Sequence, residues 1–243
     1  MTTVTCKEAG GWAVLDQALQ AARPGDVVRV GAGVFTGDTA LRVPDGVRLE
    51  GAAGAVLIHH GHGPAVELRG VTGASVADLR IESRATGVPW RVLPEDPPIL
   101  ERWTDDYRRP SEWGLVWVDG AEDIAIERLV LAGPGAAETW LGGITARNAR
   151  KVMLRSCEVA GFGGSAISFV SCTESAVHDC DASRAAYGIV LFRSAAAPGP
   201  CEVAIEGNRC HDNAHSGIVL LSSEAEALAG NECWGNGGNG IAL

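Results

Sequence analysis

The heptapeptide GNRCHDN at residues 207–213 returns as GNECWGN at residues 230–236, 23 residues later. A second phrase, a small residue followed by Ile or Leu, recurs at intervals of 22 to 29 residues, beginning at Gly114, Gly143, Ala166, Gly188, Gly217 and Gly240. A repeat at a fixed period of about 20–50 residues is the sequence signature of a solenoid, whose units each pack on their neighbours. The repeat therefore decides the fold before any local propensity is considered.

Each repeat contains three short runs in which apolar and polar residues alternate. In the unit that begins at Gly188, the alternating pairs are Ile189 with Leu191, Val203 with Ile205, and Asn208 with Cys210. Alternation with a period of two is typical of strands, and no intervening segment is long enough for a helix. The pattern predicts an all-β parallel β-helix with about 22–23 residues, three strands and three turns in each coil.

Residues one period apart should then be stacked neighbours, roughly 4.8 Å apart. The sequence places like residues at this spacing, namely Asn208 and Asn231, Asn213 and Asn236, Cys210 and Cys233, and Cys157 and Cys180. Stacked Asn side chains can hydrogen-bond to buried backbone inside a turn, and stacked Cys side chains are small and apolar. We expect both kinds of stack inside the solenoid.

These phrases also carry a resemblance to a known family. The segments Gly217-Ile218-Val219-Leu220, 207–213 and 230–233 resemble the repeats of right-handed β-helices of the pectin-lyase-like superfamily, and the likeness covers nearly the whole chain. The resemblance implies a right-handed coil with a helix as N-terminal cap. It implies less about activity, because the superfamily includes lyases, hydrolases, epimerases, phage tail proteins and non-catalytic modules.

The sequence predicts a single domain over residues 1–243 with two departures from the repeat. Residues 1–26 form an N-terminal cap, in which 13–22 have helical apolar spacing and Arg23-Pro24-Gly25-Asp26 ends the helix. Residues 84–113 are a long insertion rich in Pro, charge and Trp, and loops of this length are usually functional or disordered. The last coil begins at Gly240 without a capping segment after it, which predicts a longer natural chain or end-to-end pairing.

Net charge and cysteine content limit the classes of function that the sequence allows. The net charge of −10 argues against a nucleic-acid partner. No apolar run is long enough to span a membrane, and residues 1–6 lack the features of a signal peptide. The seven Cys are an odd number at interior repeat positions, which favours reduced thiols and a cytoplasmic location over disulfides between coils.

The first strands of the coils are expected to present one face to solvent. On it we place Glu67, Arg69, Val116, Val118, Thr145, Arg147, Ser168, Val170, Val190, Phe192, Val219 and Leu221. The polar members adjoin the insertion and predict a cleft there. The apolar members, above all Val190, Phe192 and Leu221, predict a partner surface, and a homodimer through this strip or through the last coil is one interpretation.

Acid–base and aromatic residues gather around the same cleft in sequence. The candidate catalytic residues are His60, His62, Glu67, Arg69, Glu101, Asp105 and Arg147, and the candidate substrate-binding residues are Trp90, Trp103, Tyr107, Trp113 and Trp140. The alternative is that the loop charges are solvated and the Trp side chains only anchor the loop. A metal site at His59, His60 and His62 is less favoured, because adjacent side chains in an extended turn point in opposite directions.

Two functions follow from these residues. The first is a carbohydrate-active protein, a lyase, hydrolase or epimerase that acts on a sugar-containing molecule or glycan beside residues 84–113. The alternative is a non-catalytic interaction module, part of a larger protein or of a homo-oligomer. We expect no metal and no cofactor. Ca²⁺, which the resemblance implies for lyases of the superfamily, is the alternative.

Overall fold

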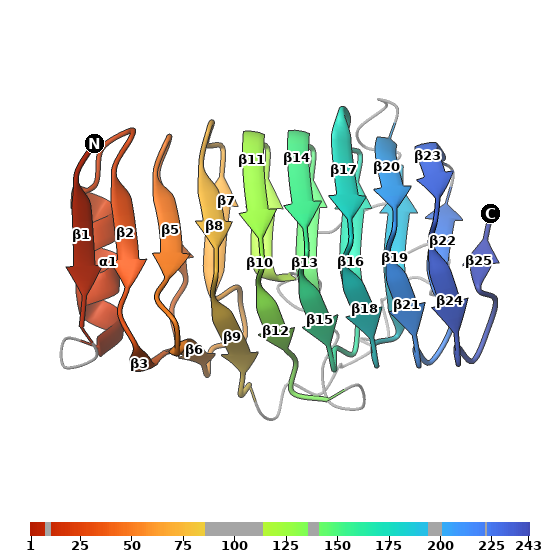
Figure 1. The fold of residues 1–243 in the computed structure, drawn as a ribbon, viewed down its shortest axis with the longest axis horizontal. Coiled ribbons are helices and arrows are strands. Elements are labelled where there is room, and N and C mark those ends of the chain that lie inside the picture. Colours follow the sequence, from red (N-terminus) through yellow and green to blue (C-terminus); the bar gives the residue numbers. More distant parts are fainter. Residues whose placement is uncertain (8–10, 86–113, 136–140, 194–200, 222) are drawn as a thin grey trace, which may run out of the picture.

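The computed structural model describes residues 1–243 except 8–10, 86–113, 136–140, 194–200 and 222. In the described part of the chain, strands follow one another around three parallel sheets, and each strand pairs with the matching strand of the next coil. Figure 1 shows the coils side by side along the long axis of the molecule, with the N-terminus at one end and the C-terminus at the other. The predicted parallel β-helix is confirmed.

Sheet C contains the first strand of each coil, sheet A the second and sheet B the third. Sheet A is formed by β1 (Thr3–Cys6), β2 (Val27–Val30), β5 (Arg48–Gly51), β8 (Ser75–Ala77), β11 (Glu122–Glu127), β14 (Arg150–Arg155), β17 (Ser175–His178), β20 (Glu202–Glu206) and β23 (Glu224–Ala229). Sheet B is formed by β3 (Gly33–Gly37), β6 (Ala55–His59), β9 (Arg80–Ser83), β12 (Val130–Ala132), β15 (Glu158–Ala160), β18 (Asp181–Ser183), β21 (Arg209–His211) and β24 (Glu232–Trp234). Sheet C is formed by β4 (Leu41–Arg42), β7 (Val66–Arg69), β10 (Gly114–Asp119), β13 (Gly142–Arg147), β16 (Ser165–Val170), β19 (Tyr187–Phe192), β22 (Ile218–Leu221) and β25 (Ile241–Ala242).

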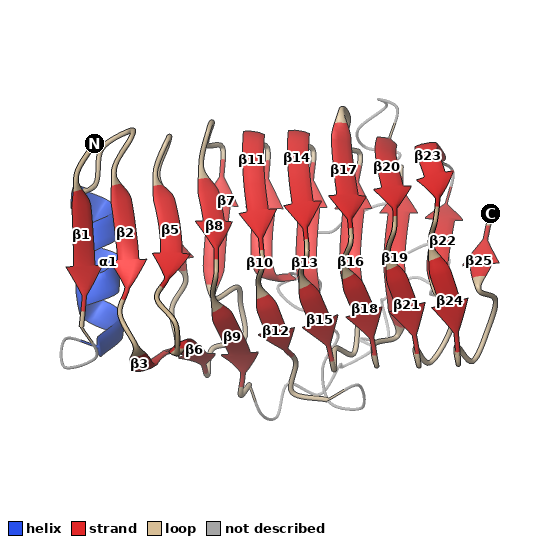
Figure 2. Cartoon of the chain, viewed as in Figure 1, coloured by secondary structure: helices blue, strands red, loops and turns tan. Residues whose placement is uncertain are grey.

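The helix α1 (Gly11–Ala21) lies at the N-terminal end of the solenoid, behind β1 and β2 in Figures 1 and 2. It buries Trp12, Leu15 and Leu19, one turn apart, as a helix with one apolar face does. The predicted helix over 13–22 is therefore present. The apolar spacing of the sequence also predicts Val14 on its buried face, but Val14 is 37% exposed. Its role as a cap stays a prediction.

The interior of the solenoid consists of rows of apolar side chains. One inward row of sheet A runs through Leu49, Val76, Ile126, Leu154 and Val177, which occupy matching positions on successive strands and are fully buried. Burial at about 25 cal/mol for each Å² of apolar surface makes such rows the main source of stability. A single core cluster extends from the N-terminal coils to Leu220.

Two asparagine ladders carry polar groups into this interior. Asn208 Nδ2 donates to Asn231 Oδ1 at 3.0 Å and to the carbonyl oxygen of Val177 at 3.0 Å, and its Oδ1 accepts from the backbone N–H of Cys180 at 2.9 Å. Asn213 Nδ2 donates to Asn236 Oδ1 at 3.0 Å in the same way. Cys210 and Cys233 are register partners on β21 and β24. These contacts confirm the 23-residue stacking expected from the sequence.

Replacing Asn208 by Ala should lower the free energy of unfolding by about 2–5 kcal/mol, because it leaves the Cys180 N–H and the Val177 carbonyl buried without partners. Urea unfolding followed by circular dichroism measures the loss. Asn231→Ala breaks the same ladder at its partly buried member and should cost less than half as much. A loss below about 1 kcal/mol for Asn208→Ala would contradict the ladder as a source of stability, and equal costs for the two variants would contradict the role of burial.

Candidate functional site

The outer face of sheet C is hollowed over β7, β10 and β13. A pocket of about 740 Å³ lies there, lined by Asp38, Ala40, Arg42, Gly63, Pro64, Glu67, Arg69, Trp117, Asp119, Arg147 and Asn148. The strands place these side chains because alternate residues of a strand face the same side of the sheet. Three of the predicted catalytic residues, Glu67, Arg69 and Arg147, thus line one pocket, as expected.

Two rows of outward side chains form the floor of this pocket. In one row Arg42, Glu67 and Trp117 are register partners, and Arg42 Nε lies 2.9 Å from Glu67 Oε2. In the other row Arg69, Asp119 and Arg147 are register partners, and Arg69 Nε lies 3.5 Å from Asp119 Oδ2.

The charges of the pocket balance. The charged side chains in its lining are three carboxylates and three guanidinium groups, namely Asp38, Glu67 and Asp119 with Arg42, Arg69 and Arg147. The side chain of Glu67 is 12% exposed and that of Asp119 is 22% exposed, so both are largely shielded from bulk water. Hydrogen-bond donors and acceptors therefore alternate along the pocket floor, and the two carboxylates there have little contact with bulk water.

Trp117 and Asp119 hold the outward positions that the repeat pattern predicted for Val116 and Val118, because the predicted register of β10 was wrong by one residue. Gly114 pairs with Gly142, whereas the repeat phrase had been aligned on Gly143. A shift by one residue moves every side chain of a strand to the other face. Val116 and Val118 are therefore buried in the core, and Trp117 and Asp119 take the outward positions. The alternation of Trp117 and Asp119 with the two valines was the signal for this register.

The three histidines of the turn after β6 do not converge. His59 is fully buried, with its ring 5.8 Å from that of Trp12, and its Nε2 donates to the carbonyl oxygen of Gly63 at 3.1 Å. His60 is exposed and lines a different pocket, and His62 is exposed and lines neither. The predicted roles of His60 and His62 in the cleft are therefore not supported by their positions, since the turn points its side chains in different directions.

Several predicted residues lie outside the described part of the chain. They are Trp90, Glu101, Trp103, Asp105, Tyr107 and Trp113 in residues 86–113, and Trp140 in residues 136–140. Their roles remain predictions.

The apolar strip of sheet C is not an open surface. Val170, Val190 and Phe192 face away from the core on β16 and β19, yet they are only 1%, 1% and 5% exposed. Burial within the single chain removes most of the apolar area that a partner would contact. The homodimer, through this strip or through the last coil, stays a prediction.

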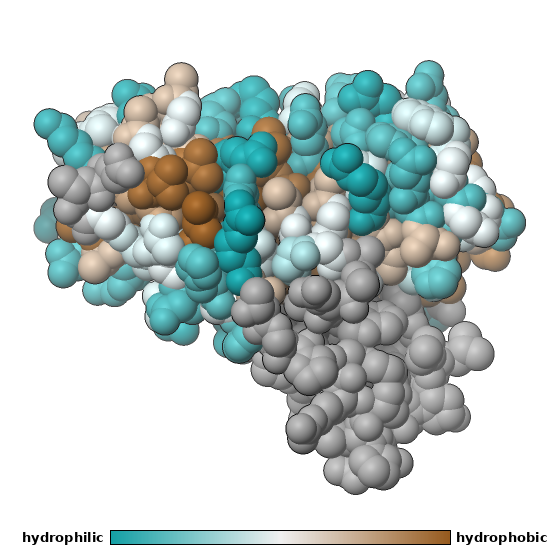
Figure 3. All heavy atoms as spheres, turned by 90° about the horizontal axis from the view of Figure 1, so that it is seen from below, coloured by the Kyte–Doolittle hydropathy of each residue, from teal (hydrophilic) through white to brown (hydrophobic). Residues whose placement is uncertain are grey.

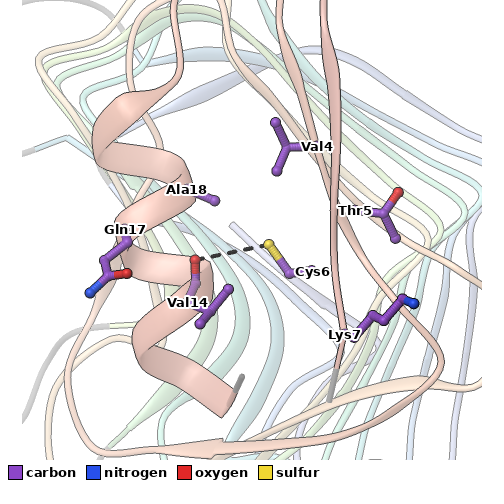
Figure 4. A pocket seen from close by; sticks show the side chains of 7 residues that line it. All are labelled: Val4, Thr5, Cys6, Lys7, Val14, Gln17 and Ala18. Carbon is purple, nitrogen blue, oxygen red and sulfur yellow. Dashed lines mark hydrogen bonds between the residues drawn. The ribbon is translucent and has the colours of Figure 1, made fainter. Parts of the chain in front are cut away.

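A further pocket, of about 450 Å³, opens at the N-terminal end between β1 and α1 (Figure 4). Its lining is Val4, Thr5, Cys6, Lys7, Val14, Gln17 and Ala18, and Cys6 Sγ lies 3.9 Å from the carbonyl oxygen of Val14. Burial raises the pKa of the Cys6 thiol. Lys7 is the one charged side chain among these lining residues, so this pocket offers no pair for acid–base chemistry.

Comparison with solved structures shows the same architecture in carbohydrate-active proteins. The A-module of a mannuronan C-5 epimerase from Azotobacter vinelandii matches with a TM-score of 0.57 at 15% identity, covering 94% of this chain and 67% of that one. A Parabacteroides merdae protein described as a candidate glycosyl hydrolase matches with a TM-score of 0.51 at 13% identity, covering 91% and 96%. At these identities the likeness shows the fold, and the chain shares with both proteins the architecture of a right-handed parallel β-helix.

The family model described as "Periplasmic copper-binding protein (NosD)" matches residues 135–243 of this β-helix. No curated protein matches the sequence. The periplasmic description contradicts the cytoplasmic location expected from the cysteines, so that expectation is wrong. The α-helix that the structure describes is too short to cross a membrane.

The described residues of this β-helix do not fit a copper site. They contain no group of three or more His, Cys, Asp or Glu placed to hold a metal ion. Cys210 and Cys233 are stacked within the matched segment, but burial raises the pKa of both thiols and so disfavours the thiolates that bind copper. The described residues, which hold no such group of carboxylates, also give no support to the Ca²⁺ alternative.

Replacing His59 by Leu should flatten the pH dependence of stability below pH 7. Burial lowers the pKa of the His59 imidazole, and its Nδ1 has no hydrogen-bond partner in the described part of the β-helix. The unfolded chain therefore binds more protons, and stability should fall as the pH drops below about 6.5, by up to about 1.4 kcal/mol per pH unit. Urea unfolding at pH 7.5 and pH 5.5 measures this difference.

The exposed His62 supplies the control for this measurement. His62→Gln should keep the pH dependence of the parent protein, because it removes an exposed histidine of the same turn and leaves the buried His59 in place. If His59→Leu lost as much stability on acidification as the parent, the buried imidazole would not be the responsible group.

Proposed function

We propose that this β-helix binds a carbohydrate in the sheet C pocket and acts on it there, as an epimerase, lyase or hydrolase. The observation that carries the proposal is the pocket floor, on which Glu67, Arg69, Trp117, Asp119 and Arg147 converge from three adjacent strands. A volume of about 740 Å³ falls within the range of about 300–1,000 Å³ for sites that hold small ligands.

The balanced charges suit a sugar. Carboxylates accept hydrogen bonds from hydroxyl groups and guanidinium groups donate to them, so the alternating rows can satisfy a polyhydroxylated ring over its whole edge. Trp117 adds an indole beside Glu67 and Asp119, and aromatic side chains combine an apolar body with a polar edge. The periplasmic description of the matching family supports action outside the cytoplasm.

Glu67 and Asp119 are the acid–base pair of this proposal. They lie on adjacent strands and two positions apart in register, which separates their Cα atoms by roughly 8 Å at standard strand spacings. Side chains on Cα atoms at this spacing can reach either separation of carboxyl groups used in glycoside hydrolysis, about 5–5.5 Å for retention or about 6.5–9.5 Å for inversion. In an epimerase or lyase one carboxylate would take the proton from the carbon next to a uronate carboxyl group. The other, in its protonated form, would give a proton to the opposite face of that carbon or to the leaving oxygen, and Arg69 and Arg147 would stabilise the charge that develops.

A panel of neutral and uronate oligosaccharides tests the proposal. We expect at least one to bind and to be converted, with products followed by chromatography and NMR. Glu67→Gln and Asp119→Asn should each lower kcat/KM by at least about 100-fold, the usual contribution of a positioned acid or base. Thermal unfolding should show that both variants remain folded.

The control removes a carboxylate of sheet A. Glu206 lies on β20, and its Oε2 is 3.3 Å from Nδ1 of His178 on β17. Glu206 is not among the residues that line the pocket, and Glu206→Gln should leave turnover unchanged. Binding without conversion would overturn the catalytic claim and leave a carbohydrate-binding module. Binding that survives both pocket substitutions would place the sugar elsewhere.

A further inference from the structure

A second large pocket lies on the opposite side of the histidine turn. It has a volume of about 750 Å³ and is lined by Ile58, His60, Arg80, Glu82, Ser83, Arg84, Ala85, Ala132, Gly133 and Pro134. Gly63 and Pro64 of the same turn line the sheet C pocket, so residues 59–64 separate the two cavities. The proposed sugar site does not use this second pocket.

One carboxylate in this pocket holds two guanidinium groups. Glu82 Oε1 accepts from Arg80 Nε at 2.8 Å, and Glu82 Oε2 accepts from Arg84 Nη2 at 2.6 Å. Both oxygens of Glu82 are thereby occupied, while each arginine has five N–H donors and these bonds use one from each. Arg80 and Arg84 remain 49% and 60% exposed, so their other donors are accessible from solvent.

The pocket therefore has an excess of positive charge. Among the described residues, the charged side chains in its lining are Arg80, Arg84 and Glu82, with His60 beside them, in a protein whose net charge is −10. The hydrogen bond from Arg80 lowers the pKa of Glu82, as does that from Arg84, so the carboxylate that orients the two arginines stays ionised at neutral pH. The sheet C pocket, with balanced charges, differs in this respect.

Apolar side chains flank the charged group on both sides. Ile58 on β6, Glu82 on β9 and Ala132 on β12 are register partners, as are Val56, Arg80 and Val130 one row away. Figure 3, which views this side of the molecule, shows a narrow hydrophilic band between hydrophobic areas where β9 lies between β6 and β12. A ligand in this pocket meets paired cationic donors with apolar contacts beside them.

We propose that this second pocket is a binding site for an oxyanion, a carboxylate, sulfate or phosphate group, held by Arg80 and Arg84 with His60 at its edge. The planar guanidinium group matches the geometry of such groups, and two of them oriented by one carboxylate are arranged before the ligand arrives. The part of the ligand that carries the anion packs on Ile58 and Ala132.

Sulfate, phosphate, acetate and glucuronate, with glucose as the neutral probe, test this site on the whole chain at constant ionic strength. We expect saturable binding of at least one oxyanion by calorimetry, with amide NMR shifts concentrated at residues 80–85 and no response to glucose. Arg80→Gln with Arg84→Gln should weaken that binding by at least about tenfold, since the two substitutions remove the charge-assisted hydrogen bonds to the oxyanion. Tighter binding of glucuronate than of acetate would identify a sugar-borne anion, and the reverse order a free one.

The chain contains a matched control for the arginine pair. Arg29 and Arg48 are held by the two oxygens of Glu50 in the same way on sheet A, and none of the three lines either pocket. Arg29→Gln with Arg48→Gln removes the same charge and should leave the oxyanion affinity within about twofold, because screened surface charge contributes little. Equal weakening by the two double variants, or no saturable binding of any oxyanion, would overturn the proposal. Glu67→Gln should keep oxyanion binding, which separates this test from that of the sugar site.

Discussion

In-register stacking of each coil on the next is the constraint on which the rest of this structure depends. A parallel ladder repeats the same position at a spacing of about 4.8 Å, so every residue belongs to a row that is wholly inside or wholly outside. Asn208 and Asn231 form an inward row, in which a buried polar side chain is stable because its neighbour completes its hydrogen bonds. The outward row of Arg69, Asp119 and Arg147 obeys the same geometry and becomes the floor of a pocket.

The same constraint explains what the sequence could predict. A 23-residue spacing fixed the interior, because stacked Asn and Cys residues repeat visibly at residues 207–213 and 230–236. The pocket was predicted in part, and the error at β10 arose where Gly142 and Gly143 offered two alignments of equal quality. The direction of a side chain in a turn has no periodic signal, and so the burial of His59 could not be anticipated from sequence.

In the segment similar to a copper-binding family, the described cysteines pack the coil. Repeat positions such as Cys210 and Cys233 are set by the need for small apolar groups in a close-packed interior. Burial raises the pKa of the Cys172 thiol to about 12, and a thiol that stays protonated is a poor ligand. The matched residues 135–243 thus include positions whose packing a solenoid requires whatever it binds.

The two arginine–glutamate–arginine groups show how surroundings decide the chemistry of one motif. Glu50 and Glu82 each hold two arginines across their oxygens, so local pairing alone does not distinguish them. On sheet A the Glu50 group lines none of the three pockets described above, and an exposed ion pair there adds little beyond solubility. At Glu82 the neighbouring turn and the apolar residues of β6 and β12 form walls around the same arrangement, so that one ligand can contact the arginine donors and apolar side chains at the same time. A ladder contact that only stabilises the solenoid in one place can thus become a binding site in another, because turns of different length enclose it.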